Sequence, residues 1–159
     1  MNVLILKIIA LTSMIIDHYG AIFQGGIEVY RIIGRIAFPI YCFLLIEGYS
    51  HTSDIKKYAK RLLIFALVSE IPFDLAFYGG LDFSHQNIFF TLFIGLVTIH
   101  LLDKEGRKSA LKIALIIIGV FFLAIVLSVD YNFLGIIYIL LFNNVRSYSK
   151  SKGLVLVAF

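Results

Sequence analysis

The chain has 159 residues, of which 60% are hydrophobic and 15% charged, and its mean hydropathy is +0.96. Soluble domains carry about 45–50% apolar and about 25% charged residues, so the composition excludes secreted disulfide scaffolds, soluble dinucleotide-binding enzymes and free nucleic-acid binders. Apolar runs near the length of a bilayer crossing recur along the chain. They predict an all-α, polytopic transmembrane helix bundle formed by one domain over residues 1–159.

Six apolar segments are predicted to be membrane spans. The first is expected to be a retained helix, because no small-residue cleavage site follows it. The sixth is short, which favours a re-entrant or tilted segment. A seventh begins near Gly153 and reaches the end of the sequence after seven residues, so we expect it to be truncated or completed by a partner. The six spans are residues 3–23, 32–51, 60–79, 87–103, 109–128 and 132–145.

Basic residues predict the orientation of the spans, because short cytoplasmic loops retain Lys and Arg. Eleven of the 14 Lys and Arg residues lie in or beside alternate connections, so these connections and the amino terminus are predicted to be cytoplasmic. This bias accounts for the net charge of +4 without a nucleic-acid partner. Membrane lipids are the expected surroundings, and an oligomer is compatible with the sequence. The eleven are Lys56, Lys57, Lys60, Arg61, Lys104, Arg107, Lys108, Lys112, Arg146, Lys150 and Lys152.

One face of the first span combines a cation with an imidazole. At the i, i+4, i+7, i+11 spacing of a helix, this face carries Lys7, Leu11, Met14 and His18. A rise of 1.5 Å per residue separates Lys7 from His18 by about 16 Å. Asp17 lies about 100° around the helix from His18, so it orients the ring only if the helix unwinds there.

The ionisable residues at membrane depth form two sets, and such residues usually face the bundle interior or a watery cavity. The outer set is Asp17, His18, Arg31, Arg35, Glu70, Asp74 and the loop Ser84-His85-Gln86-Asn87. The inner set is Lys7, Glu47, His51 and the basic cluster at residues 56–61.

Each of these residues also has a structural explanation that needs no catalytic role. Capping of the first span would account for Asp17 and His18. An ion pair with Arg35 would account for Glu70 and Asp74, which flank the helix-disrupting Pro72. The other structural alternatives are interfacial anchoring for Arg31 and Arg35, an ordinary loop position for His85, and a hydrogen bond between helices for Glu47 and His51.

No metal is expected. The four histidines show no metal-ligand spacing, and the single cysteine, Cys42, lies in an apolar run.

Three stretches resemble the TraX family, which is named for a protein that acetylates the amino terminus of conjugative pilin. The motifs DH, GRIAFPI, EGY-x-HT, SEIPFDL and FSHQN-x-FFT occur in family order and cover about the first hundred residues. The stretches are Leu6–Gly20, Arg31–Thr52 and Tyr58–Phe90. Family members are usually longer than this chain. The resemblance implies a protein of the bacterial cytoplasmic membrane that acetylates the amine of a small membrane-inserted peptide or pilin.

A more distant resemblance is to integral-membrane acyltransferases that acetylate sugars. Those enzymes carry a basic residue and, eleven positions later, a catalytic histidine in the first helix, which Lys7 and His18 match. They also have a basic cluster at the start of a later helix, comparable to Lys56–Arg61.

Together these observations predict acyl transfer from cytoplasmic acetyl-CoA, with His18 as general base. Either Asp17 or Glu70 is expected to hold the imidazole, and Arg35 and Asn87 to stabilise the thioester oxyanion. The predicted catalytic set is His18, Asp17, Arg35, Glu70, Asp74, His85 and Asn87. The predicted acetyl-CoA-binding set is Lys7, Glu47, His51, Lys57, Lys60 and Arg61.

Three alternatives stay open from the sequence. One is a non-enzymatic membrane factor for pilin or peptide assembly, in which the outer acidic residues hold an amino terminus. Another is an acyltransferase that acts on a sugar or lipid hydroxyl. The third is a proton-coupled transporter with a relay of His18, Glu70 and Asp74, which is disfavoured because paired inverted segments are missing.

The loop charges generate a test of topology. Cysteine introduced at position 82 is expected to react with an impermeant reagent from outside the cell, and cysteine at position 57 only after permeabilisation. Accessibility labelling of intact and permeabilised cells makes the measurement. The reverse pattern would contradict the predicted orientation.

Overall fold

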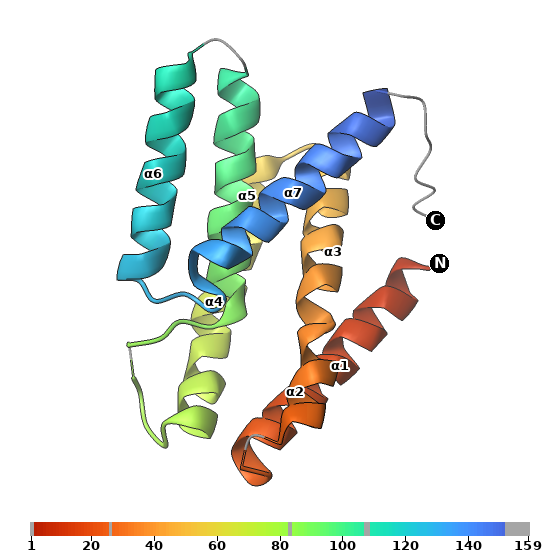
Figure 1. The fold of residues 1–159 in the computed structure, drawn as a ribbon, viewed down its shortest axis with the longest axis vertical. Helices are drawn as coiled ribbons and strands as arrows, with labels where there is room; N and C mark the ends of the chain where they lie inside the picture. Colours follow the sequence, from red (N-terminus) through yellow and green to blue (C-terminus); the bar gives the residue numbers. More distant parts are fainter. Residues whose placement is uncertain (1, 26, 83, 107–108, 152–159) are drawn as a thin grey trace.

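The computed structural model describes residues 2–25, 27–82, 84–106 and 109–151. Within them the regular secondary structure is helical, apart from one isolated β-bridge, which confirms the predicted all-α bundle (Figure 1). The predicted seventh segment lies outside the described residues. The helices are α1 (Val3–Phe23), α2 (Glu28–Arg35), α3 (Ala37–His51), α4 (Ile55–Phe77), α5 (Ile88–Glu105), α6 (Ala110–Val126) and α7 (Asn132–Ser151).

Polar side chains cap the first turns of four helices. Asn2, Asp54, Asn87 and Ser109 each accept a hydrogen bond from a backbone N–H in the first turn of α1, α4, α5 and α6 respectively. Such caps satisfy backbone donors that have no partner inside the helix. These capping residues explain where the four helices begin in the sequence.

A proline explains why α2 and α3 are separate helices within one continuous stretch. Pro39 lies in the first turn of α3, and a proline ring clashes with the carbonyl of the residue four positions earlier. That residue is Arg35, where α2 ends. The two helices together span Glu28–His51, which matches the predicted second span with four more residues at its start.

The α7 helix corrects the sixth predicted span. It runs from Asn132 to Ser151 without interruption, so Asn143 and Asn144 do not end it, and the segment is one continuous helix of 20 residues. In Figure 1 it crosses α3 and α5 obliquely, as the tilted alternative predicts.

The α5 helix occupies the centre of the bundle and packs against α3, α4, α6 and α7. Two clusters of buried residues join these helices. One lies between α3, α5 and α7 and contains Phe38, Cys42, Leu96 and Ile139 among others. The second joins α5, α6 and α7 through Ile94, Ala124, Val129 and Ile136.

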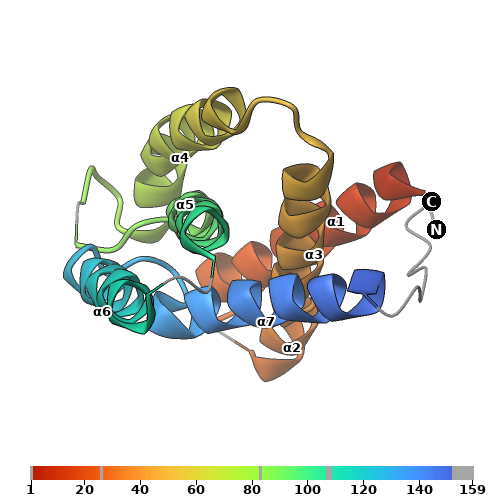
Figure 2. The same ribbon diagram turned by 90° about the horizontal axis from the view of Figure 1, so that it is seen from above.

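The α1 helix packs on α2 and α3, whereas α4 packs on α5. Figure 2, seen from above, shows α1 and α3 on one side of the molecule and α4 on the other. The contact between α1 and α2 is close, because a Cβ at Gly20 would collide with Tyr30 and a Cβ at Gly34 would collide with Asp17. These glycines hold α1 tightly on the α2–α3 side.

In the described part of the chain, two helical stretches are long and apolar enough to cross a membrane by length and composition. They are α1 (Val3–Phe23) and the continuous α2–α3 stretch (Glu28–His51), and Ala110–Val126 is a shorter apolar helix. Large apolar side chains are exposed on the outer faces of several helices, such as Ile8 on α1, Phe65 on α4 and Phe122 on α6. Apolar surface of this extent marks an interaction with lipid or protein, and it favours a membrane protein. The orientation in a membrane stays a prediction.

Candidate functional site

Two adjoining cavities lie between α1 and α3 on one side and α4 and α5 on the other. The His18 cavity has a volume of about 240 Å³ and also receives residues from α2 and from the connection between α6 and α7. The Lys7 cavity has a volume of about 860 Å³. Phe89, in the first turn of α5, lines both cavities.

The α1 helix presents its predicted stripe to these cavities. Met14 and His18 line the His18 cavity, and Lys7 and Leu11 line the Lys7 cavity. Because α1 stays helical throughout Val3–Phe23, one straight face carries the cation and the imidazole to different cavities.

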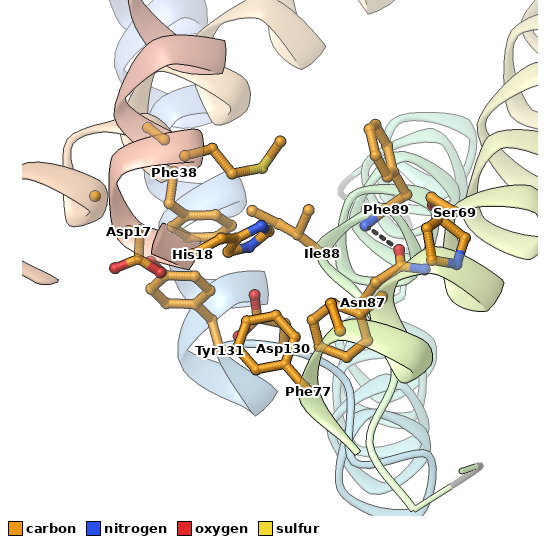
Figure 3. A pocket seen from close by; sticks show the side chains of 16 residues that line it. Asp17, His18, Phe38, Ser69, Phe77, Asn87, Ile88, Phe89, Asp130 and Tyr131 are labelled. Atoms are coloured by element: carbon orange, nitrogen blue, oxygen red, sulfur yellow. Dashed lines mark hydrogen bonds between the residues drawn. The ribbon is translucent and has the colours of Figure 1, made fainter. Parts of the chain in front are cut away.

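Aromatic rings of α4 surround His18. Its ring centroid lies 5.2 Å from that of Phe77 at an interplanar angle of 86°, and 6.5 Å from that of Phe73 at 62°. Both are edge-to-face arrangements, which are favourable for aromatic pairs. Figure 3 shows the His18 ring in the cavity, between α1 and the aromatic residues opposite.

Asp17 points toward α2 instead of His18. Its Oδ2 accepts a hydrogen bond from Arg31 Nη1 at 2.8 Å in an ion pair, and its side chain packs on Gly34. In Figure 3 the Asp17 carboxylate points away from the His18 ring. Since α1 does not unwind at this position, the condition for Asp17 to orient His18 is not met.

Glu70 and Asp74 are buried behind the His18 cavity, at 7% and 0% exposure, and line neither cavity. Glu70 Oε2 accepts hydrogen bonds from the backbone N and the side-chain Nδ2 of Asn87, and Nδ2 also donates to Ala66 O at 2.9 Å. Asp74 Oδ2 accepts from Asp82 N at 3.0 Å. Glu70 Oε1 and Asp74 Oδ1 have no hydrogen-bond partner among the described residues. These bonds fix the start of α5 on α4.

The connection between α6 and α7 brings Asp130 and Tyr131 to the His18 cavity. A parallel bridge joins Val129 to Gln86, and Asp130 N donates to Gln86 O at 2.9 Å. Thr91 Oγ1 donates to the Asp130 carbonyl. The backbone on both sides of Asp130 is therefore held by the start of α5 and the segment before it.

This connection also contains unusual backbone conformations. The φ angles of Ser128, Tyr131 and Asn132 are 46°, 60° and 47°, in the left-handed region that residues other than glycine seldom adopt.

Tyr131 stacks on Phe38, with ring centroids 4.0 Å apart and planes at 8°. Burial raises the pKa of Tyr131 to about 12 and also raises the pKa of Asp130, against the opposing effect of nearby His85.

Basic and aromatic side chains line the Lys7 cavity. They include Lys7 from α1, His51 from α3, and Arg61 and Tyr58 from α4. The Arg61 guanidinium carbon lies 5.9 Å from the centroid of the Tyr58 ring, within the range of a cation–π contact. The cavity thus offers two full positive charges and an aromatic ring.

Glu47 also lines this cavity, but its charge is balanced. Glu47 Oε1 forms an ion pair with Arg146 Nη1 of α7, and its Oε2 lies 3.6 Å from His51 Nδ1. Glu47 is 8% exposed. The pair therefore links α3 to α7 at the wall of the Lys7 cavity.

Besides Glu70 and Asp74, four predicted site residues lie away from both cavities. Arg35 is exposed, and no ion pair joins it to Glu70 or Asp74 in the described part of the chain. Lys57 pairs with Asp54 at 3.4 Å, and Lys60 is exposed. His85 packs on Phe73, with ring centroids 6.4 Å apart.

Among the residues that the structure describes, no group of three or more His, Cys, Asp or Glu side chains is arranged to hold a metal ion.

Four residues at these sites were not predicted as site residues from the sequence: Tyr58, Asp130, Tyr131 and Arg146. The sequence indicates Arg146 only as a loop charge, and both Asp130 and Arg146 lie beyond the first hundred residues that carry the family motifs. The one available signal was an Asp-Tyr pair in a short connection between two apolar segments.

The family model described as TraX protein matches residues 3–158. A protein of Dichelobacter nodosus, described as a probable fimbrial assembly protein FimC of serogroup H1, is 36% identical over 124 residues, covering 70% of this chain and 50% of that relative. An uncharacterized protein of Rickettsia prowazekii (strain Madrid E) is 32% identical over 91 residues, covering 57% of this chain and 34% of the relative.

The chain thus matches half or less of the length of these two relatives. No solved structure matches the chain.

The Glu47–Arg146 pair generates a stability test. Arg146→Met is expected to lower the free energy of unfolding by about 3 kcal/mol, because it leaves a buried carboxylate without its cation, whereas the double variant Glu47→Leu, Arg146→Met should recover most of that loss. Thermal or denaturant unfolding in detergent measures both.

The matched control is Lys112→Met, which removes the cation of the more exposed Glu105–Lys112 pair at 2.8 Å and should cost at most about 1 kcal/mol. Equal losses for Arg146→Met and the control would contradict a structural role for the pair.

Proposed function

The chain belongs to the TraX family, and we propose that it is a membrane acyltransferase that moves an acetyl group from acetyl-CoA to the terminal amine of a pilin-like peptide. The proposal places it in the bacterial cytoplasmic membrane with its amino terminus in the cytoplasm. The chain matches only part of its relatives' length, so the proposal concerns the part of the machinery that these residues form.

One observation carries the proposal. The stripe on α1 runs along two adjoining cavities, with Lys7 in the larger one and His18 in the smaller. An acetyl donor needs an anion-binding mouth, a path for its long arm and a base at the acetyl group. These three requirements correspond to the Lys7 cavity, the face of α1 and the His18 cavity.

The donor end of this path is basic. Lys7 and Arg61 would bind the phosphates of acetyl-CoA, and Tyr58, which lines the same cavity, would provide an aromatic surface for the adenine. The distance of about 16 Å between Lys7 and His18 along the helix suits the extended pantetheine arm. The exposed Lys57 and Lys60 would act only at long range, through a potential that salt screens.

The acceptor end contains the base. An α-amino group has a pKa near 8 and is mostly protonated at neutral pH, so its proton must leave before attack. That first proton would be lost to solvent water. The neutral amine nitrogen would then attack the thioester carbon while His18 takes the second proton of the nitrogen, and the carbon–sulfur bond would break. The thiolate of CoA would then take the proton from the His18 imidazolium. Asn87 also lines this cavity, but its buried side-chain amide donates to Glu70 and to Ala66 O. These bonds fix the start of α5 on α4.

Two findings favour an amine of a pilin-like peptide as acceptor. The relative in Dichelobacter nodosus is described as a probable fimbrial assembly protein, and two carboxylates, Asp17 and Asp130, line the His18 cavity. An ammonium group is attracted to carboxylates, whereas a hydroxyl group does not need them.

The printed description of that relative also fits a non-enzymatic assembly factor, which would use the same acidic surround to hold a peptide terminus. An acyltransferase that acts on a sugar or lipid hydroxyl would use the same donor path. The experiments below separate these alternatives from N-acetylation.

The direct test is mass spectrometry of pilin-like peptides incubated with acetyl-CoA and the purified protein in lipid. Acetylation adds about 42 Da to the amine, and His18→Ala should lower the rate by about 10²- to 10⁴-fold. The matched control is His100→Ala, because His100 packs near Tyr49 and lines neither cavity. Acetyl transfer only to hydroxyl groups, or peptide binding without transfer, would contradict the proposed N-acetylation.

A second test concerns donor binding. Arg61→Ala and Lys7→Ala are each expected to raise the KM for acetyl-CoA by about 10-fold with a smaller change in kcat, because each removes a cation from the proposed phosphate site. Lys57→Ala, which removes a cation outside the cavity lining, should change KM by less than about 3-fold. Equal effects of all three variants would mean that the cavity does not select the donor.

A further inference from the structure

The proposed chemistry uses the carboxylates of the His18 cavity only as an acidic surround for the acceptor and gives neither of them a role toward His18. Asp17 and Asp130 are the acidic residues that line it in the described part of the chain. Asp17 is paired with Arg31 at 2.8 Å and directed toward α2. Glu70 and Asp74, the other candidates from the sequence, lie behind the wall and bind backbone N–H groups of Asn87 and Asp82.

Asp130 is aimed at His18 by its surroundings. Figure 3 shows its carboxyl group directed into the cavity below the His18 ring, and the two groups interact electrostatically. The stronger interaction of His18 with Asp17 is opposed by that with Arg31. The ion pair thus leaves Asp130 as the carboxylate whose charge is not neutralised by a neighbouring guanidinium.

The backbone of this region holds Asp130 in place at some energetic cost. Positive φ angles occur at Ser128, Tyr131 and Asn132, and this conformation strains residues other than glycine. The bridge to Gln86, the bond from Thr91 and the stacking of Tyr131 on Phe38 offset this cost. Strained residues that are held this firmly cluster at functional sites.

We propose that Asp130 is the positioning residue of His18, so that the two form an Asp–His pair in the His18 cavity. This inference rests on the proposed acyl transfer. During the reaction His18 gains a proton among aromatic side chains, where a cation is poorly solvated. The Asp130 carboxylate stabilises that imidazolium and orients the ring, and the proton itself stays on His18 until the CoA thiolate takes it.

Several charged groups face this pair from other elements. Asp17 and Arg31 act on His18 from α1 and α2. His85, from the connection between α4 and α5, and Asp17 act on Asp130. Burial raises the pKa of Asp130 and Asp17 adds to this effect, whereas His85 and His18 oppose it. An imidazolium at His18 therefore favours the ionised form of Asp130.

The test compares Asp130→Asn with wild-type protein in lipid. Loss of the carboxylate should lower kcat by about 10- to 100-fold, leave the KM for acetyl-CoA unchanged, and move the low-pH limb of the pH–rate profile to lower pH, because the imidazolium loses its counter-charge. Asp130→Glu should recover part of the rate. The matched control, Asp82→Asn, changes a loop carboxylate that bonds to Ser84 N at 2.7 Å and lines neither cavity.

A neutral acceptor separates positioning of His18 from binding of the acceptor ammonium. Hydroxylamine is an amine that is uncharged at neutral pH, and its acetylation should fall in Asp130→Asn by the same factor as that of a peptide. If only the KM for a charged peptide rose and hydroxylamine acetylation were unaffected, Asp130 would be an ammonium-binding residue and the inference would be wrong.

Nitrogen NMR of the His18 ring supplies a readout that does not depend on catalysis. With Asp130 present, one neutral tautomer should dominate, and in Asp130→Asn the ring should show a mixture of tautomers. Helical circular dichroism and thermal unfolding verify that the variant is folded. If no acetyl transfer occurs in any variant, the proposed function fails, whereas an unchanged His18 spectrum in folded Asp130→Asn overturns the Asp–His pair.

Discussion

The uninterrupted helical path of α1 is the constraint on which the candidate site depends. One face of a single helix delivers Lys7 and His18 to two different cavities, so the distance between the proposed donor-binding end and the base is fixed by helix geometry at about 16 Å. The close contacts of Gly20 with Tyr30 and of Gly34 with Asp17 hold this helix on the α2–α3 side. The opposite wall can therefore be supplied by α4 and α5, with space between for a ligand.

That opposite wall is organised by buried polar groups. Glu70 binds Asn87 at the start of α5, Asp74 binds the backbone of Asp82, and the bridge between Gln86 and Val129 attaches the connection that carries Asp130. Burying carboxylates is costly unless they are hydrogen-bonded or paired. Glu70 and Asp74 lie beside the His18 cavity, where their hydrogen bonds maintain the geometry of the site. They stand out in the sequence as acidic residues of an apolar helix, but they are not part of the cavity lining.

Local rules predicted the helices and the α1 stripe, since both follow from hydropathy and a period of 3.6 residues. The first span agrees with α1 at both ends, and the outline of α4 to α6 agrees within a few residues. Partners across the bundle could not be predicted in this way. Asp17 pairs with Arg31 only because the turn between α1 and α2 brings them together. Asp130 reaches the His18 cavity only through a β-bridge and positive φ angles that no periodicity encodes. Arg35 shares a helix face with Arg31, yet it is exposed.

The central claim is that one path through the bundle joins a donor at the Lys7 end to an acceptor at the His18 end. The most direct measurement uses proteoliposomes in which the protein has one verified orientation, with labelled acetyl-CoA confined to the Lys7 side and an impermeant pilin-like peptide to the other. The account predicts label on the peptide amine, with transfer lost in His18→Ala and retained in His100→Ala. Transfer only when donor and peptide share one side of the membrane would contradict it.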